Sequence, residues 1–94
     1  MILFVGNLSK LTTEKEVTQL LSGYGEVTKS MLMVDKITRR SRGCAYIDML
    51  EPNSGENAVY KLNNTVFMGS SIVVEKATTR QLTAIEWKNT VPAK

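Results

Sequence analysis

The chain has 94 residues, of which 43% are hydrophobic and 22% are charged, and its formal net charge is +3. This length fits one domain, and the composition is that of a folded protein rather than of a disordered segment. The single cysteine and the lack of histidine exclude an internal disulfide and weigh against metal sites and most hydrolases. No apolar run approaches the roughly 20 residues of a membrane span, and no signal peptide is recognisable. We therefore expect a soluble binding domain with no cofactor, no metal and no membrane partner, in the cytoplasm or, in a eukaryote, the nucleus.

The chain opens with a predicted strand followed by a predicted helix. Residues 2–8 are mostly apolar and are followed by polar residues, a pattern that predicts a short buried strand. Thr13 and Glu16 have the spacing of a capping box, in which each side chain accepts a hydrogen bond from the backbone amide of the other. Apolar residues then recur at helical spacing until Gly23, so a helix is predicted over about residues 13–22.

Two strands joined by a basic loop are predicted next. Residues 27–34 and 43–50 are apolar and strand-like, and the polar segment 35–42 lies between them. The cations of this segment are Lys36, Arg39, Arg40 and Arg42. A local patch of this kind can attract a polyanion even when the whole protein is only mildly basic. An ordinary solvated loop would have the same composition, so the loop alone does not decide between the two.

A helix and a last strand complete the predicted order. Pro52 and the polar residues after it are typical of a helix start, and Asn63 is typical of a helix end. Gly55 is expected to weaken this helix. The turn residues within 66–71 indicate a short hairpin arm before a final strand at 72–75.

The predicted order of elements is strand, helix, strand, strand, helix, strand. This order is typical of an α+β ferredoxin-like β-α-β-β-α-β sandwich, a four-stranded antiparallel sheet with two helices on one face. The other face of such a sheet is left open, so the side chains that point to it are candidates for function.

Two strings in the predicted strands resemble the RNA recognition motif family. Residues 3–8 read LFVGNL, and residues 42–49 read RGCAYIDM, which follows the family pattern at five positions. The resemblance implies an RNA recognition motif domain over residues 1–77, followed by a tail at 78–94. The chain is similar to the small single-domain RNA-binding proteins of bacteria. The second string departs from the pattern at Cys44 and at Met49, where the family has aromatic residues, and Met49 is expected to face the core.

The resemblance implies that the open face binds single-stranded RNA. Strand alternation places Phe4 and Tyr46 on this face, where each ring offers a base a stacking surface. The cations of the loop would contact phosphates, and Glu75 would accept hydrogen bonds from base amino groups. The full set of predicted RNA-contacting residues is Phe4, Asn7, Lys29, Met31, Met33, Lys36, Arg39, Arg40, Arg42, Cys44, Tyr46, Asp48 and Glu75.

Several alternatives remain open from the sequence. The missing ring at Cys44 and the soft apolar Met31 and Met33 also suit a protein-interaction module whose sheet face is covered by a peptide, a second copy of the chain or its own tail. The tail itself could dock as a short helix, contact RNA through Trp87 or be disordered. A small enzyme or a redox role for Cys44 has little support, because no catalytic set accompanies the cysteine.

Overall fold

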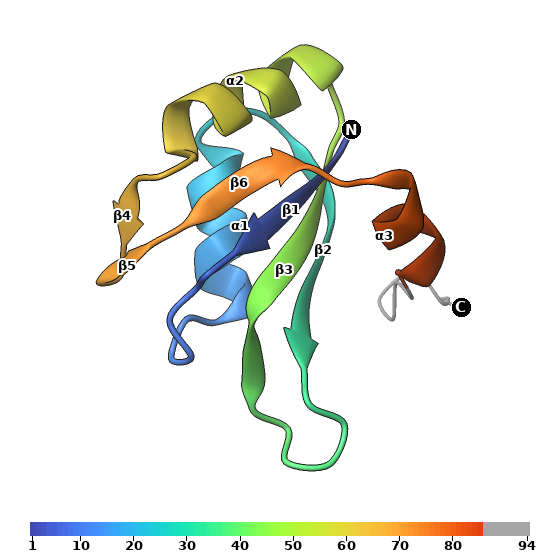
Figure 1. Ribbon diagram of the computed structural model, residues 1–94. Coiled ribbons are helices and arrows are strands. Elements are labelled where there is room, and N and C mark those ends of the chain that lie inside the picture. Colours follow the sequence, from blue (N-terminus) through green and yellow to red (C-terminus); the bar gives the residue numbers. More distant parts are fainter. Residues whose placement is uncertain (86–94) are drawn as a thin grey trace.

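The structure is a computed structural model that describes residues 1–85. Its main sheet has four strands in the spatial order β2-β3-β1-β6, and each neighbouring pair is antiparallel. The bounds of these strands are β1 Ile2–Gly6, β2 Val27–Val34, β3 Ser41–Met49 and β6 Val73–Lys76. Helices α1 (Glu14–Ser22) and α2 (Pro52–Leu62) lie together on one side of the sheet (Figure 1). The predicted fold is thus confirmed.

Helix α1 begins as its capping box predicts. The backbone amide of Glu16 donates to Thr13 Oγ1 at 3.2 Å, and the amide of Thr13 donates to Glu16 Oε1 at 2.9 Å. Val17 and Leu21, one turn apart, are fully buried against the sheet. The first helical residue is Glu14, because Thr13 serves as the cap.

Helix α2 begins at Pro52, as predicted, and its glycine has a packing role that the sequence does not reveal. Gly55 is buried, and a Cβ atom at this position would lie 2.5 Å from the sulfur of Met1. The glycine that weakens the helix therefore also permits its close approach to the start of β1. After the helix, Asn63 Oδ1 accepts a hydrogen bond from the amide of Val74 at 3.0 Å, and Asn64 takes a left-handed conformation with φ of 66°.

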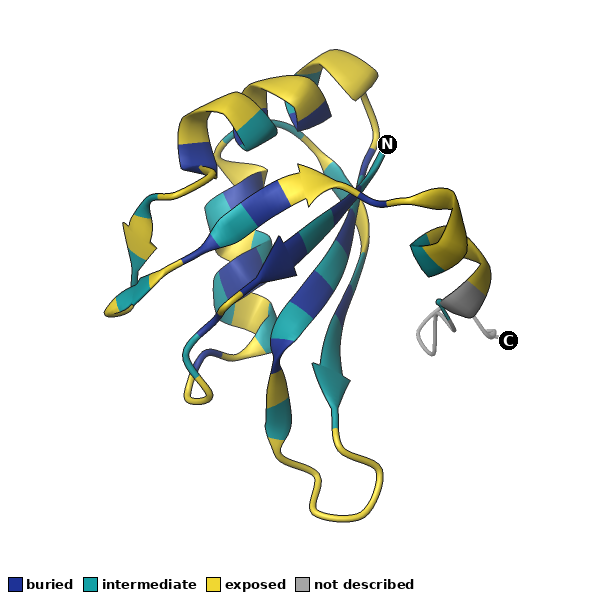
Figure 2. Cartoon of the chain, in the orientation of Figure 1, coloured by how far each residue is buried: buried dark blue, intermediate teal, exposed yellow. Residues whose placement is uncertain are grey.

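The core lies between the sheet and the two helices. Leu3 and Val5 of β1 are fully buried, whereas Phe4 between them is partly exposed. The same alternation runs along β3, where Ile47 is fully buried and Tyr46 is partly exposed (Figure 2). The sheet therefore buries one face, and the face opposite the helices remains accessible.

A small hairpin arm precedes β6, as predicted. Strands β4 (Val66–Phe67) and β5 (Ser70–Ser71) pair with each other, and the turn residues Met68 and Gly69 have φ of 51° and 84°. Two positive φ values in a two-residue turn are typical of a type I′ hairpin.

After β6 the chain passes to the β2 side of the sheet in Figure 1, where a short helix α3 (Thr79–Ala84) lies. Thr78 caps this helix, with the amide of Gln81 donating to Thr78 Oγ1 at 3.1 Å. The sequence left a docked helix as one of three outcomes for the tail, and a helix is present, although Leu82 remains largely exposed. Trp87 lies outside the described residues. Within residues 1–85, each helix is too short and too polar to cross a lipid bilayer.

Candidate functional site

Four side chains form one row across the open face of the sheet. Met31 on β2 pairs with Tyr46 on β3, Tyr46 pairs with Phe4 on β1, and Phe4 pairs with Glu75 on β6. Directly paired residues of antiparallel strands point to the same face, so these side chains are immediate neighbours. The row therefore runs from an apolar end on β2 to an acidic end on β6.

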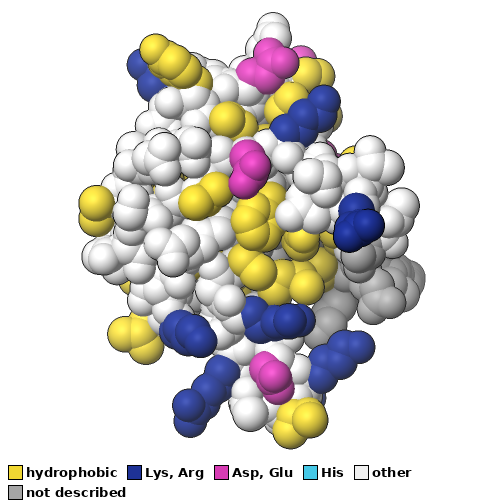
Figure 3. Space-filling view, viewed as in Figure 1, with side chains coloured by type: hydrophobic (Ala, Val, Ile, Leu, Met, Phe, Trp, Pro, Cys, Tyr) yellow, Lys and Arg dark blue, Asp and Glu magenta, His cyan; other side chains and the backbone are white. Residues whose placement is uncertain are grey.

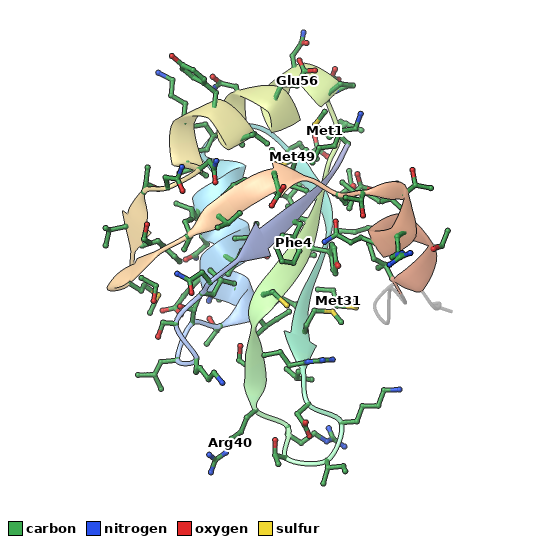
Figure 4. The ribbon with its side chains drawn as sticks, in the orientation of Figure 1. Met1, Phe4, Met31, Arg40, Met49 and Glu56 are labelled. Carbon is green, nitrogen blue, oxygen red and sulfur yellow. The ribbon has the colours of Figure 1, made fainter. Side chains whose placement is uncertain are left out.

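The two aromatic rings of this row lie side by side at the centre of the sheet. The ring centroids of Phe4 and Tyr46 are 5.6 Å apart and the ring planes are tilted by 56°. Figure 4 shows Phe4 in front of the sheet, on the side away from the helices. The ring leans over Gly6, since a Cβ atom at Gly6 would lie 2.7 Å from Phe4 Cε2. The absence of a side chain at Gly6 thus decides where the Phe4 ring rests.

Asp48 and Lys29 extend the site along the sheet. Asp48 stands opposite both Ile2 and Lys29 in the register of the strands. Its Oδ1 atom lies 3.5 Å from the α-amino group of Met1, which also donates to the carbonyl of Met49 at 2.8 Å. The carboxylate of Asp48 is therefore engaged with a cation of the chain itself.

Met31 and Met33 differ in exposure although both lie on β2. Met31 is 7% exposed but is not part of the core between the sheet and helices, because it faces the same side as Tyr46. Met33 is partly exposed and lies where the pairing of β2 with β3 shifts, between Leu32 and Val34. The apolar surface predicted for this edge is therefore present, but its central methionine is mostly covered.

The loop of the β2–β3 hairpin is an ordered turn that Asp35 organises. Asp35 Oδ1 accepts hydrogen bonds from the amides of Ile37 at 2.8 Å and Thr38 at 2.9 Å. These two backbone donors, Thr38 first, lower the pKa of the Asp35 carboxyl below its ordinary value. The amide of Asp35 also donates to the carbonyl of Arg40 at 2.8 Å, which closes the turn.

The cations of this loop are all exposed. They lie beyond the end of the β2 and β3 strands, so Lys36, Arg39 and Arg40 are apart from the aromatic row. Arg42 is closer, because alternation along β3 places it on the same face as Cys44 and Tyr46. In the space-filling view, basic side chains surround the lower rim of an apolar patch at the centre of the open face (Figure 3).

Asn7 has a structural role that was not predicted. It takes a left-handed conformation with φ of 55°, and its Nδ2 atom donates to the carbonyl of Ser71 at 2.7 Å. This bond ties the end of β1 to the strand that leads into β6. The predicted RNA contact of Asn7 therefore stays a prediction for a side chain that already has a partner.

Burial shifts the pKa of two groups on the open face, Cys44 and Tyr46. It raises the pKa of the Cys44 thiol, against the opposing effect of the Arg42 charge. Burial also raises the pKa of the Tyr46 phenol, and the neighbouring Cys44 adds to this shift. A protonated thiol is a poor nucleophile, so the structure gives no support to a redox role for Cys44.

Two glycines that shape the site were not among the predicted contacts. Gly6 accommodates the Phe4 ring. Gly43 has φ of 78°, its carbonyl accepts from the amide of Leu8 at 2.8 Å, and a Cβ atom here would lie 3.1 Å from the Leu8 carbonyl oxygen. Both glycines stand in the strings at 3–8 and 42–49, so their positions were the available signal. Among residues 1–85, no three potential metal-ligating side chains gather at one place.

Comparison with known proteins agrees with this architecture. The family model of the RNA recognition motif matches residues 3–73. The RbpD protein of Nostoc sp. is 36% identical over 81 residues, which are 86% of this chain and 86% of RbpD. The crystal structure of RNA Binding Protein PG1 is 35% identical with a TM-score of 0.80, covering 82% of this chain and 93% of that one. The RNA15 RRM with bound RNA (GU) is 26% identical with a TM-score of 0.75, covering 82% of each chain. The chain therefore belongs to the RNA recognition motif family.

Proposed function

We propose that this domain binds single-stranded RNA on its open sheet face, with Phe4 and Tyr46 stacking two bases. The observation that carries the proposal is the pair of partly exposed rings 5.6 Å apart at the centre of the sheet. Exposed aromatic surface is costly in water, and an unstacked base covers it at a gain of about 1–3 kcal/mol for each base. The solved complex of the RNA15 RRM with RNA (GU) supports this choice of ligand for the fold.

The cations of the hairpin would add contacts with the RNA backbone. Lys36, Arg39 and Arg40 would contact phosphates from the hairpin, and Arg42 would do so at the edge of the aromatic patch. Because Cys44 stands where a third ring is usual, we expect two stacking surfaces and weak binding with little sequence dependence from stacking alone. No reaction is part of this proposal.

The test compares binding of short single-stranded RNA by the parent chain and by Phe4→Ala and Tyr46→Ala. Each variant should lose about 5- to 150-fold in affinity, the equivalent of about 1–3 kcal/mol. Tyr60→Ala is the matched control, because Tyr60 lies on α2 and is 82% exposed on the helical side. Phe4→Leu separates stacking from packing, since leucine keeps the apolar bulk without a π face. Unchanged affinity in Phe4→Ala and Tyr46→Ala, or no binding at low salt by the parent, would refute the proposal.

A second candidate function is a protein-interaction or self-associating module. Met31 favours it, because this side chain is only 7% exposed although it lies on the face away from the core. The helix α3, which follows β6, also favours it. We propose that the domain ends at residue 77, and the buried Ala77, whose amide donates to the carbonyl of Ile2 at 2.9 Å, supports this boundary. Removal of residues 79–94 tests the tail as a cover of the sheet. Tighter RNA binding by the shortened chain would support a covering tail, and a concentration-dependent increase in mass would support self-association.

A further inference from the structure

The acidic end of the row across the sheet is Glu75. Its Cα is paired with that of Phe4, so its side chain rises from the open face beside the ring. The side chain is exposed, and no residue among 1–85 donates a hydrogen bond to its carboxylate or forms an ion pair with it. Glu75 is the acid of β6, and the strand register places it next to Phe4. As far as the described part of the chain extends, this carboxylate at the rim of the proposed stacking site has no partner.

Within residues 1–85, no cation forms an ion pair with this carboxylate. Lys76 follows it in β6 but pairs with Leu3, whose side chain is in the core, so Lys76 points to the helical side. The cations of the hairpin loop lie at the far end of β2 and β3. Asp48, the other acid of the open face, differs from Glu75 because its Oδ1 atom lies 3.5 Å from the amino group of Met1.

An unpaired negative charge on a surface that binds RNA lowers affinity through repulsion of phosphates, unless the carboxylate gains hydrogen bonds from the ligand. An ionised carboxylate only accepts hydrogen bonds, and it accepts two parallel ones most favourably. The Watson–Crick edge of guanine presents two adjacent donors, N1–H and the N2 amino group. The edges of adenine, cytosine and uracil each place an acceptor beside their donor, which would face a carboxylate oxygen.

The position of the Phe4 ring brings a stacked base to this carboxylate. The ring leans along β1 over Gly6, with Tyr46 on the β3 side and Glu75 on the β6 side. A base on the ring therefore has one edge toward β6, within reach of the flexible Glu75 side chain. We propose that Glu75 is a specificity-determining residue that selects guanine at the base stacked on Phe4. This inference rests on the proposed RNA-binding function.

The test uses a short oligouridine and the same oligomer with one central guanosine, adenosine, cytidine or inosine, bound by the full chain at neutral pH and low salt. The parent should bind the guanosine oligomer about tenfold more tightly than oligouridine, as expected for a charge-assisted pair. Inosine, which has no N2 amino group, should give an intermediate preference. Glu75→Ala should remove the preference and bind oligouridine at least as tightly as the parent, because a repulsive charge is gone.

Matched variants separate base recognition from charge and from folding. Glu56→Ala removes an exposed carboxylate from α2, at the position labelled in Figure 4, and should keep the guanosine preference. Glu75→Gln keeps the size of the side chain with one acceptor and should lower the preference without removing binding. Equal binding of all oligomers by the parent, or an unchanged preference in Glu75→Ala, would overturn the assignment of guanine to Glu75 while the RNA-binding function stands. Failure of the parent to bind any of these oligomers would overturn both.

Discussion

The centre of the sheet and the loop of the β2–β3 hairpin are built by different means. The aromatic row depends on the register of four strands, and the Phe4 ring rests over Gly6 and beside Tyr46. The hairpin loop depends on Asp35 and its own backbone, and its cations are exposed. We expect the first region to supply stacking that salt affects little, and the second to supply attraction that salt screens.

Gly6→Ala should have the largest effect, because it displaces the Phe4 ring of the aromatic row. The new Cβ would lie 2.7 Å from Phe4 Cε2, so the ring has to move from its position. Because the contact is with the far end of a side chain, we expect a stability cost near the lower end of the about 1–3 kcal/mol typical of overpacking. RNA affinity should fall at least about tenfold with an unchanged salt dependence. Gly23→Ala is the control, since its Cβ would meet only the Leu20 carbonyl oxygen at 3.4 Å.

Cys44→Phe should strengthen the same region. Cys44 shares the open face with Tyr46 on β3, so the substitution adds a third ring to this face. Affinity for short single-stranded RNA should rise by about tenfold, within the range of one added stacking contact. Cys44→Ser tests whether removal of the thiol alone has the same result. An equal change in both variants would show that the ring is not the cause.

Removal of positive charge from the hairpin should make RNA affinity less dependent on salt concentration. Replacing Lys36 and Arg40 by glutamine removes two proposed phosphate contacts from the exposed loop. The slope of log affinity against log salt should become shallower by about 1.4, that is about 0.7 for each phosphate on a single strand. The same change at Lys15 and Lys61, which are exposed on the helices, should leave the slope as it is.

Loss of the Asp35 carboxylate should have the smallest effect on RNA binding. It should loosen only the turn of the β2–β3 hairpin. The pKa of this carboxyl is lower in the fold than in the unfolded chain. Its hydrogen bonds therefore stabilise the turn above the ordinary aspartate pKa, and this contribution is lost as the pH falls through the lowered pKa. NMR shifts of the Ile37 and Thr38 amides should follow that transition. Asp35→Ala should speed hydrogen exchange at the same amides and leave those of β1 unchanged, whereas faster exchange in both places would show that the turn is coupled to the sheet.

Local patterns predicted most of the fold. Thr13 and Glu16 identified the start of α1, and the bounds of β2 were predicted as residues 27–34 and observed as Val27–Val34. The strand ends were less accurate, since β1 ends at Gly6 and not at residue 8, and β3 begins at Ser41 and not at residue 43. The end of a strand depends on its partner strand, because pairing continues only where both strands supply backbone N–H and C=O groups.

The sequence predicted which side chains of the candidate site share the open face of the sheet, but it did not predict the contacts that these side chains make. Strand alternation alone placed Phe4, Tyr46 and Glu75 on the open face. The hydrogen bond of Asn7 to Ser71 and the contact of the Phe4 ring with Gly6 depend on where the backbone turns and on which rotamer packs. The low exposure of Met31 was also not predictable. Alternation along β2 placed this side chain on the open face but did not indicate what covers the side chain.

The sequence by itself determined the order of the elements, the buried and open faces of each strand and the two aromatic residues at the centre. These follow from periodicity and from caps, which act between residues near one another in the chain. Only the tertiary structure decided that β6 lies beside β1, and therefore that Glu75 stands next to Phe4. The physical reason is that this pairing joins residues about 70 positions apart, and is selected by the packing of both helices on one face of the sheet rather than by any local preference.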